Sequence, residues 1–378
     1  MAGAGQRLLS HFASLEDPRV ERTKLHPLPT VLGIAICAVI CGAESWDEIA
    51  AFGEARADWF ATFLDVRNGI PSHDTFNRVF AALDPAQFEA CFLSWVRAAR
   101  RSLPEQVIAV DGKTVRRSHD RGRGKAAIQL VSAWAAEQRL VLAQLKVAEQ
   151  ANEITAIPEL LRAVELSGCL VTIDAMGCQR SIAEQVLEQG GDYVLALKGN
   201  QPALAADVQE CFAQAQADRF VGVQHDAHQA VDKGHGRLEI RRRWVITDPD
   251  VLAWLHTEHG WPGLQAIGMV QSERRLADTT TVGTRYYLLS RPLSAQALGT
   301  AVRSHWGIEN QVHWVLDMSF GEDQSRIRRG LAAENAAILR RIALNAVRHH
   351  SWKHYSIKAR RLIAGWNDAY RLQLLMDL

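Results

Sequence analysis

Apolar residues recur at intervals of three and four along the first hundred residues of the chain. The repeats lie at 31–43, 46–64, 75–84 and 86–100. This spacing places the apolar side chains on one face of each helix. The first of these segments is apolar throughout, which is typical of a helix buried on all sides. The pattern therefore predicts a small bundle of helices over about residues 8–102.

The segment 69–80, GIPSHDTFNRVF, has two interpretations. It could form the turn and second helix of a helix-turn-helix motif, which inserts that helix into the major groove of DNA. Ser72 and Asp74 also stand where helix caps belong, after a Gly-Ile-Pro break. We favour the capping interpretation.

From residue 106 the pattern becomes that of strands. The run QVIAVDG at 106–112 is a short apolar strand that ends in an acid, and 127–148 is typical of two strands turned around 137–139. Helices at 155–167 and 179–190 then alternate with strands at 169–177 and 192–199. This order predicts an α/β core built on a mixed sheet with flanking helices.

Residues 200–290 are predicted to interrupt that core. A helix is expected at 202–217 and strands at 237–247, 264–276 and 279–290. The segment therefore has the character of an insertion with its own β structure. The helical period resumes at 294–320.

Two strands of the predicted core end in an aspartate. Asp111 follows the apolar run VIAV, and Asp174 follows LVTI. Open α/β sheets place their active sites beyond the carboxyl ends of strands, so the two carboxylates are candidates to lie side by side. The alternative is that each aspartate caps a turn or a following helix.

The 378-residue chain is 48% hydrophobic and 22% charged, which is the composition of a globular protein with two or three domains. Its longest apolar run, 31–43, is shorter than the roughly 20 residues that a membrane helix needs, so no membrane association is expected. The six cysteines form no CxxC pair, which is typical of reduced thiols in a cytosol.

Basic residues are concentrated in two places although the net charge is only +1. The first cluster follows Asp111: Lys113, Arg116, Arg117, Arg121, Arg123 and Lys125. The second lies between Arg326 and Arg361, where ten Lys or Arg residues accompany a single acid, Glu334. A solvated helix face would explain the second cluster, but two clusters together favour a polyanionic partner.

Paired carboxylates beside basic residues suggest metal-assisted phosphoryl transfer. Mg²⁺ prefers oxygen ligands and takes few carboxylates, and two such ions can activate the attacking oxygen and stabilise the leaving one. A third carboxylate is then expected. Glu309 is the best candidate, with His305 and His313 four residues away on either side. Its nearby competitors are Asp317, Glu322 and Asp323.

Several short motifs, in this order and spacing, resemble a known family over about residues 8–350. They are GIPSHDTFNRVF at 69–80, VDGKTVRRS at 110–118, IDAMGCQ at 173–179, ALKGNQ at 196–201, GHGRLEIR at 234–241, YYLLS at 286–290, RSHWGIEN at 303–310 and WVLDMSF at 314–320. The chain resembles bacterial insertion-sequence transposases of the DDE type, in the branch of H-repeat-associated proteins.

This resemblance implies a ribonuclease-H-like catalytic domain at 103–350, with a β-rich insertion at about 202–292. A helical domain at 1–102 would precede it, and a basic tail helix at 351–378 would follow. The resemblance implies Asp111, Asp174 and Glu309 as catalytic metal ligands for Mg²⁺ or Mn²⁺, with two ions as the expectation.

The function implied by the resemblance is cleavage of double-stranded DNA at the ends of a mobile element and strand transfer into target DNA. A homodimer assembled on DNA and a location with the bacterial nucleoid in the cytoplasm are expected. The chain departs from related enzymes, which carry Tyr, Arg, Glu and Lys on the last catalytic helix. Those positions hold Val302, His305, Glu309 and Leu316.

The remaining candidates would contact DNA. They are Lys113, Arg116, Arg117, Lys198, Arg303, His305, Trp306, Arg326 and Arg328. Lys113 could instead be a solvated loop lysine. Trp306 could stack on an unpaired base, but we favour burial in the core for a helix that also carries Ile308 and Trp314.

Two other functions stay open at this point. One is a catalytically silent DNA-binding protein derived from such an element. The other is a zinc hydrolase that uses His305, Glu309 and His313, although the HExxH pattern is absent and two strand-end aspartates would have no role.

Overall fold

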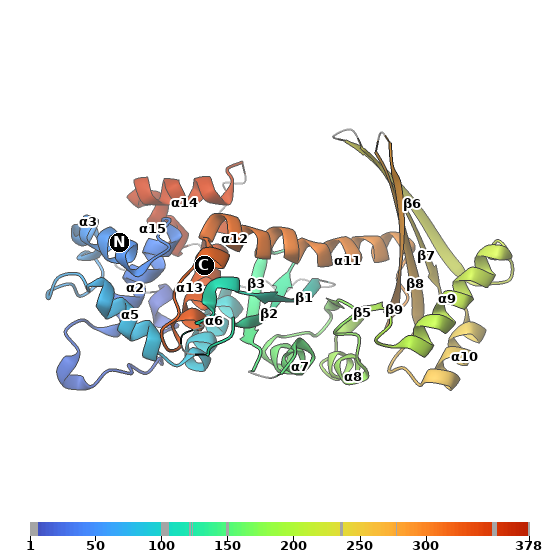
Figure 1. Cartoon of the computed structure of the whole chain (residues 1–378), viewed down its shortest axis with the longest axis horizontal. Coiled ribbons are helices and arrows are strands. Elements are labelled where there is room, and N and C mark those ends of the chain that lie inside the picture. Colours follow the sequence, from blue (N-terminus) through green and yellow to red (C-terminus); the bar gives the residue numbers. More distant parts are fainter. Residues whose placement is uncertain are drawn as a thin grey trace. The chain divides into compact units, whose positions relative to one another are not determined.

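The computed structural model describes residues 7–99, 106–120, 122, 124–148, 151–234, 237–276, 278–349 and 354–376. These residues form two compact units. Unit 1 comprises Met1–Ser102, Gly112–Glu149 and Glu309–Leu378, and unit 2 comprises Leu103–Asp111 and Gln150–Ile308. The helices and strands carry the labels of Figure 1.

Unit 1 is mainly helical. Its helices are α2 (Leu28–Ile40), α3 (Trp46–Ala55), α4 (Ala57–Phe60), α5 (His73–Ala82), α6 (Pro85–Ala99), α12 (Trp314–Phe320), α13 (Ala332–His349), α14 (Ile357–Trp366) and α15 (Asp368–Met376). Short 3-10 turns lie at Glu21–Thr23, Arg116–Ser118 and Glu322–Gln324. The predicted N-terminal helices are confirmed.

Helix α13 forms the centre of unit 1. It packs against α2, α5, α6 and the strand β3 (Leu140–Lys146). Its residues from Asn335 to Val347 are all buried, so it has no solvated side for most of its length. Helix α2 is buried along nearly its whole length as well, as its continuous apolar sequence predicts.

Local capping explains where several of these helices begin. Ser45 and Glu48 form a capping box at the start of α3, with Glu48 N donating to Ser45 Oγ at 3.3 Å. Ser72 is the N-cap residue of α5, and its hydroxyl lies 3.2 Å from that of Thr75. Ser72 therefore occupies the predicted N-cap position, but its side chain bonds no backbone N–H of the helix, so capping by this side chain is not confirmed.

The C-terminal region differs from the predicted single tail helix. Two helices, α14 and α15, are separated at Asn367. Asn367 Oδ1 accepts a hydrogen bond from Tyr370 N at 3.0 Å, which favours a new helix start at this point. The division into units also differs from the predicted domain boundaries, because α13 packs with the N-terminal helices.

A short antiparallel hairpin completes unit 1. Strand β1 (Val107–Thr114) enters unit 1 after Asp111, and β2 (Gln129–Ala135) lies between β1 and β3 in the strand order. Strands β2 and β3 are antiparallel, as the sequence predicts, and Arg139 in the turn between them has a φ of 56°. Within unit 1, this hairpin supplies an antiparallel pair of strands, β2 and β3.

Unit 2 contains the parallel strands and their continuation. Its strand order is β1, β4 (Leu170–Ile173), β5 (Asp192–Leu197), β9 (Thr280–Leu289), β8 (Ala266–Arg275), β7 (Arg237–Ile246) and β6 (His225–Gly234). Its helices are α7 (Glu153–Ala163), α8 (Arg180–Glu188), α9 (Pro202–Ala217), α10 (Pro249–His259) and α11 (Ala295–Ile308). Strands β1, β4 and β5 are parallel.

The predicted insertion extends the core sheet. Strand β9 pairs with β5 in antiparallel register, with Val194 opposite Leu289. Strand β6 and helix α10 were not predicted from the sequence. Helices α9 and α10 cover one face of β6–β9, and the start of α11 packs on the other (Figure 1). The chain therefore has the mixed α/β fold with flanking helices and a helical N-terminal region that the sequence predicts.

Candidate functional site

The register of two parallel strands brings Asp111 and Asp174 to the same sheet edge. Val110 on β1 pairs with Ile173 on β4, and each aspartate is the next residue along the chain. Strand β1 continues past Asp111 to Thr114, so the prediction that Asp111 ends its strand is wrong, whereas Asp174 directly follows the last residue of β4. Residues that follow paired positions on neighbouring parallel strands lie side by side. The two aspartates are thus neighbours within unit 2.

Asp174 is held by a tight turn. Its Oδ1 accepts hydrogen bonds from Met176 N at 3.0 Å and Gly177 N at 3.3 Å. A Cβ on Gly177 would lie 2.3 Å from Ile173 Cγ2, so glycine is required there. The turn-capping alternative is correct for this aspartate. The same two bonds fix the orientation of its carboxylate, which is compatible with a metal-binding role.

Helix α11 brings His305 to this edge. His305 Nδ1 lies 3.3 Å from Thr172 Oγ1 on β4. Burial lowers the pKa of His305, while the charges of Asp111 and Asp174 act in the opposite direction. The imidazole is therefore close enough to both carboxylates to sense their charge.

Glu309 directly follows the last residue of α11. It is exposed, and it begins a π-helical segment, Glu309–His313, that separates α11 from α12. Such segments often occur at functional sites. His305 precedes Glu309 by four residues, about one helical turn, while His313 is only 2% exposed.

A small cavity of about 150 Å³ lies beside Asp174 in unit 2. Lys198, His305 and Trp306 contribute to its lining together with Arg285. Three of the residues predicted to contact DNA, Lys198, His305 and Trp306, are thus brought together next to one of the two aspartates. Their predicted contacts with DNA stay predictions.

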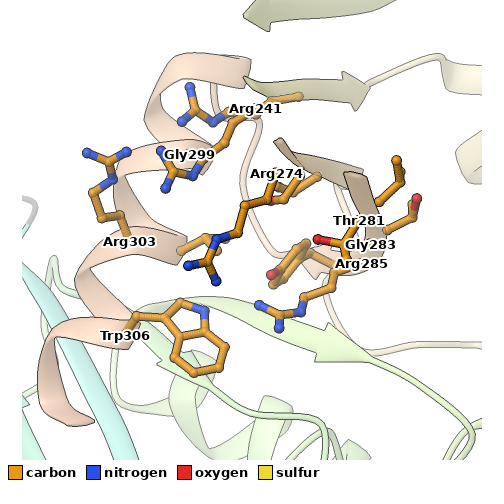
Figure 2. A pocket seen from close by; sticks show the side chains of 15 residues that line it. Arg241, Arg274, Thr281, Gly283, Arg285, Gly299, Arg303 and Trp306 are labelled. Atoms are coloured by element: carbon orange, nitrogen blue, oxygen red, sulfur yellow. The ribbon is translucent and has the colours of Figure 1, made fainter. Parts of the chain in front are cut away.

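A larger cavity of about 510 Å³ lies between α11 and the strands of the insertion (Figure 2). Its lining includes five arginines: Arg241, Arg243, Arg274, Arg285 and Arg303. Only Arg303 was predicted as a functional residue. Arg241 and Arg243 lie two residues apart on the predicted strand 237–247, which places them on one face and could have identified them; no comparable local pattern marks Arg274 or Arg285.

Trp306 borders both cavities and is 46% exposed. Arg285 lies over its ring, with the guanidinium carbon 4.8 Å from the ring centroid. The expectation that Trp306 is buried in the core was wrong, because the cavity leaves much of its ring open.

Lys113 has a structural environment in unit 1. It is 9% exposed, and its Nζ donates to the carbonyl oxygen of His313 at 3.3 Å. The same ammonium forms an ion pair with Asp317 and lies 3.1 Å from Glu322 Oε2. The solvated-lysine alternative was wrong, and these protein partners account for the position of Lys113 without DNA.

The competitors of Glu309 also have partners in unit 1. Glu322 is fully buried and pairs with Arg341 as well as Lys113. Burial raises the pKa of Glu322, but Arg341 and Lys113 outweigh it and hold that pKa at about 2. Asp323 lies 3.3 Å from Arg116. Asp317 pairs with Lys113, although burial raises its pKa.

The remaining predicted DNA contacts of unit 1 lie near the same segment. Arg116 and Arg326 are exposed, and Arg328 Nε donates to the carbonyl oxygen of Arg117 at 2.8 Å. Arg121 and Arg123 of the first basic cluster lie outside the described residues. None of these geometries tests a contact with DNA.

The second basic cluster, between Arg326 and Arg361, is only partly exposed to solvent. Neither a solvated helix face nor an exposed basic surface describes all of its residues. Four of its members are buried: Arg340, Arg341, Arg360 and Arg361. Arg361 Nη2 donates to Val39 O at the end of α2 at 2.8 Å, and Arg360 Nη1 donates to Val347 O at 3.1 Å. These arginines satisfy helix carbonyls inside unit 1, which the sequence pattern did not reveal.

Fold and site together define a class of protein: a mixed α/β protein with two aspartates on neighbouring parallel strands and an arginine-lined cavity. Comparison with known families gives the assignment. The family described as "Transposase DDE domain" matches residues 102–346, and "DDE_Tnp_1-associated" matches residues 9–96. The chain belongs to the DDE transposase family.

The chain is similar to curated proteins from Escherichia coli K12. "H repeat-associated putative transposase YhhI" is 41% identical over 344 residues, which is 90% of each chain. "Inactive transposase YbfQ" is 42% identical over 74 residues, 20% of this chain and 88% of that protein. The resemblance to H-repeat-associated transposases is confirmed by the first of these relatives.

A solved structure of a piggyBac transposase synaptic complex with hairpin DNA is 10% identical, with a TM-score of 0.46. The match covers 99% of this chain and 78% of that chain. Within the described residues, no helix has the length and apolar character needed to cross a membrane.

Proposed function

We propose that this transposase cuts DNA at the ends of an insertion sequence and joins the freed strand to target DNA. The observation that carries the proposal is the register of β1 and β4, which makes Asp111 and Asp174 neighbours. Family membership supports a transposase function, and the adjacent carboxylates support a chemical role in it. The sequence prediction of phosphoryl transfer is retained.

Asp111, Asp174 and Glu309 are the residues that we propose as metal ligands. Their donor atoms are carboxylate oxygens, which suit Mg²⁺ or Mn²⁺ better than zinc. Two bound ions would activate the attacking oxygen and stabilise the leaving oxygen of the phosphodiester. The zinc-hydrolase alternative is not retained, because it would leave the paired aspartates without a role.

Glu309 is preferred to its competitors for a physical reason. Asp317, Glu322 and Asp323 each form an ion pair with a cation in unit 1, and moving one to a metal would leave that cation unpaired. Glu309 continues the helix that carries His305, which senses both aspartates.

Other residues of the chain would position the DNA. Lys198 and Arg285 line the cavity next to Asp174, where their charges can attract the phosphate that is cut. Arg116, Arg117, Arg303, Arg326 and Arg328 are proposed as further backbone contacts. Both kinds of contact would orient the strand without reading its sequence.

The partners in this proposal are the terminal repeats of the element and the target duplex. Joining two element ends to one target requires both ends in one complex, for which we propose a homodimer assembled on DNA. We place the protein with the bacterial nucleoid in the cytoplasm. A catalytically silent DNA-binding protein is the alternative, favoured by the relative named as an inactive transposase.

Cleavage of a DNA fragment that carries the element's own ends tests the proposal. The variants are Asp111→Asn, Asp174→Asn and Glu309→Gln, each of which removes a charge but little volume. Metal-assisted charge stabilisation is worth several kcal/mol, so each change should slow cleavage by about 10²-fold or more. Binding to the same fragment, measured by gel shift, should persist.

Asp317→Asn serves as the matched comparison for the third ligand. If Glu309→Gln cuts normally while Asp317→Asn does not, Glu309 has been assigned wrongly. If the wild-type protein binds the ends but cuts nothing with Mg²⁺ or Mn²⁺, the silent-binder alternative replaces the proposal.

A further inference from the structure

The larger cavity of unit 2 is built by one face of the insertion sheet. Arg243 pairs with Val270, which pairs with Arg285, and Arg241 pairs with Ser272, which pairs with Gly283. Arg274 pairs with Thr281 two residues further along. Directly paired residues point to the same face of a sheet, so these arginines share one side.

Helix α11 forms the opposite wall. Gly299, Val302, Arg303 and Trp306 line the cavity at intervals of three and four residues, which places them on one helix face. A Cβ on Gly299 would lie 2.1 Å from Arg243 Nε, so the absence of a side chain there makes room for the arginine. Gly299 thus permits Arg243 to lie against the helix.

Protein carboxylates neutralise only part of this basic lining. Asp232 Oδ2 accepts from Arg241 at 2.5 Å and from Arg303 at 3.1 Å, and Arg241 also pairs with Glu239. Among the described residues, neither Arg274 nor Arg285 forms a salt bridge with a carboxylate. Both are exposed, and their guanidinium groups lie on the side of the cavity where Trp306 lies (Figure 2).

The size and composition of the cavity fit an unpaired nucleic-acid strand. A volume of about 510 Å³ is in the range of pockets that hold small molecules, which suits a short segment of one nucleic-acid strand. The half-exposed indole of Trp306 can stack on a base, and Arg274 and Arg285 can bind the adjoining phosphates. Arg285, Val302 and Trp306 also border the cavity beside Asp174.

We propose that this arginine pocket binds a single-stranded segment of DNA, with Arg274 and Arg285 holding its phosphates and leading it to the edge that carries Asp174. The inference rests on the proposed function, since it concerns the strand that the carboxylates would process. It adds a separate subsite on the insertion, which can be measured without cleavage. Strands β8 and β9 supply its two phosphate-binding residues.

Binding of a fluorescein-labelled single-stranded oligothymidylate of about eight nucleotides, followed by fluorescence anisotropy of the full chain, tests the inference. Arg274→Ala and Arg285→Ala remove the proposed phosphate contacts. Arg275→Ala is the matched control, because Arg275 is the neighbouring strand residue and pairs with Glu273. We expect about tenfold or greater weakening for the first two variants and little change for the control.

Gly283→Leu tests the pocket without removing a charge. Gly283 lines the cavity, and a Cβ there would meet no atom within 4 Å, so leucine should fill space without a clash. Gly234→Leu is its control, because Gly234 also has open space but does not line the cavity. Gly283→Leu should weaken binding of the oligonucleotide, and Gly234→Leu should not.

Salt dependence distinguishes a phosphate contact from a change in folding. The slope of log binding constant against log salt should fall by about 0.7 for each arginine removed. Unchanged binding by Arg274→Ala, Arg285→Ala and Gly283→Leu would overturn the inference. If cleavage still depends on Asp174 in that case, the proposed function stands without the subsite. If instead the three variants lose binding while the wild-type protein shows no metal-dependent cleavage, the subsite stands and the proposed cleavage activity is rejected.

Discussion

Two groups of basic residues, one in each unit, have opposite electrostatic surroundings. In unit 1, Lys113 and Arg341 are buried and share the carboxylate of Glu322. In unit 2, Arg274 and Arg285 are exposed in a cavity and have no carboxylate partner among the described residues. Of these two groups, only Arg274 and Arg285 keep positive charge that no protein carboxylate neutralises, and that charge can bind a substrate.

The difference follows from the cost of burying charge. A buried cation must have an anion within the protein, because removing it from water costs several kcal/mol. An exposed arginine pays little of that cost and is free to bind phosphate bidentately. The density of Lys and Arg in a sequence therefore says less about DNA binding than the location of the carboxylates that neutralise them.

The largest effect on stability is expected for Glu322→Ala in unit 1. This change leaves Lys113 and Arg341 without their shared buried partner, and should lower the free energy of unfolding by about 3–5 kcal/mol. Chemical denaturation measures the loss. Asp323→Ala removes a carboxylate next to Arg116, whose side chain is 82% exposed, and should cost less than about 1 kcal/mol.

The contribution of Glu322 to the free energy of unfolding should change with pH in a defined direction. The pKa of Glu322 is lowered to about 2, so its contribution to stability is complete above its unfolded value of 4.5 and is lost between about pH 4.5 and 2. Acid denaturation of wild type should show this dependence. A similar loss of stability for Glu322→Ala and Asp323→Ala would contradict the account.

A partly buried acid that forms no ion pair among the described residues, Glu89, should behave in the opposite way. Burial raises the pKa of Glu89 to about 8, and its Oε1 accepts a hydrogen bond from Gln144 N at 3.0 Å. Its stabilising contribution is present below its unfolded value of 4.5 and is lost as the pH rises to about 8. Glu89→Gln keeps the acceptor and should be more stable than wild type at pH 8 by a few kcal/mol.

Thermal denaturation of Glu89→Gln and wild type at pH 5 and pH 8 measures this difference. The melting temperatures should be close at pH 5 and separate as the pH rises, with the variant higher. A separation that is constant with pH would show that Glu89 stays ionised in the folded protein.

A smaller effect is expected for Arg361→Met. Arg361 donates to Val39 O at the end of α2 and lies over the ring of Phe320, 3.9 Å from its centroid. Methionine fills similar volume but cannot donate, so the variant should lose about 1–2 kcal/mol of stability. Denaturation with urea measures the change. No loss would mean that the cost of burying the guanidinium cancels its contacts.

The smallest effect on stability is expected for Arg274→Ala. An exposed arginine without an ion pair should change the free energy of unfolding by less than about 0.5 kcal/mol. The same variant is expected to lose affinity for the oligonucleotide. A large loss of stability in the urea measurement would mean that Arg274 has a structural role and would remove the contrast with Glu322.

The elements with strong periodicity were predictable from the sequence. The apolar run at 31–43 became α2, and the runs ending in Asp111 and Asp174 became neighbouring parallel strands. Strand β6 was missed because its sequence, HDAHQAVDKG, is polar and its residues are largely exposed. The hydrogen bonds to β7 stabilise that strand, and such pairing is not visible in a local pattern.

The candidate site was predictable only in part. Asp111 and Asp174 were identified because each follows an apolar strand, whereas Arg274 and Arg285 meet only through the register of β8, β9 and their neighbours. For Lys113, the sequence predicted a contact that the structure explains differently. Its place in a basic segment suggested a phosphate contact, but long-range ion pairs with Asp317 and Glu322 account for its burial.

Binding of Mn²⁺ in the absence of DNA tests the central claim that Asp111, Asp174 and Glu309 form a metal site. Isothermal titration calorimetry would compare wild type with the three single substitutions Asp111→Asn, Asp174→Asn and Glu309→Gln, and with Glu258→Gln on α10 as a control. We expect each of the three to weaken Mn²⁺ binding by tenfold or more, about 1.4 kcal/mol, and the control to leave it unchanged. Equal affinity in wild type and all three variants would contradict it.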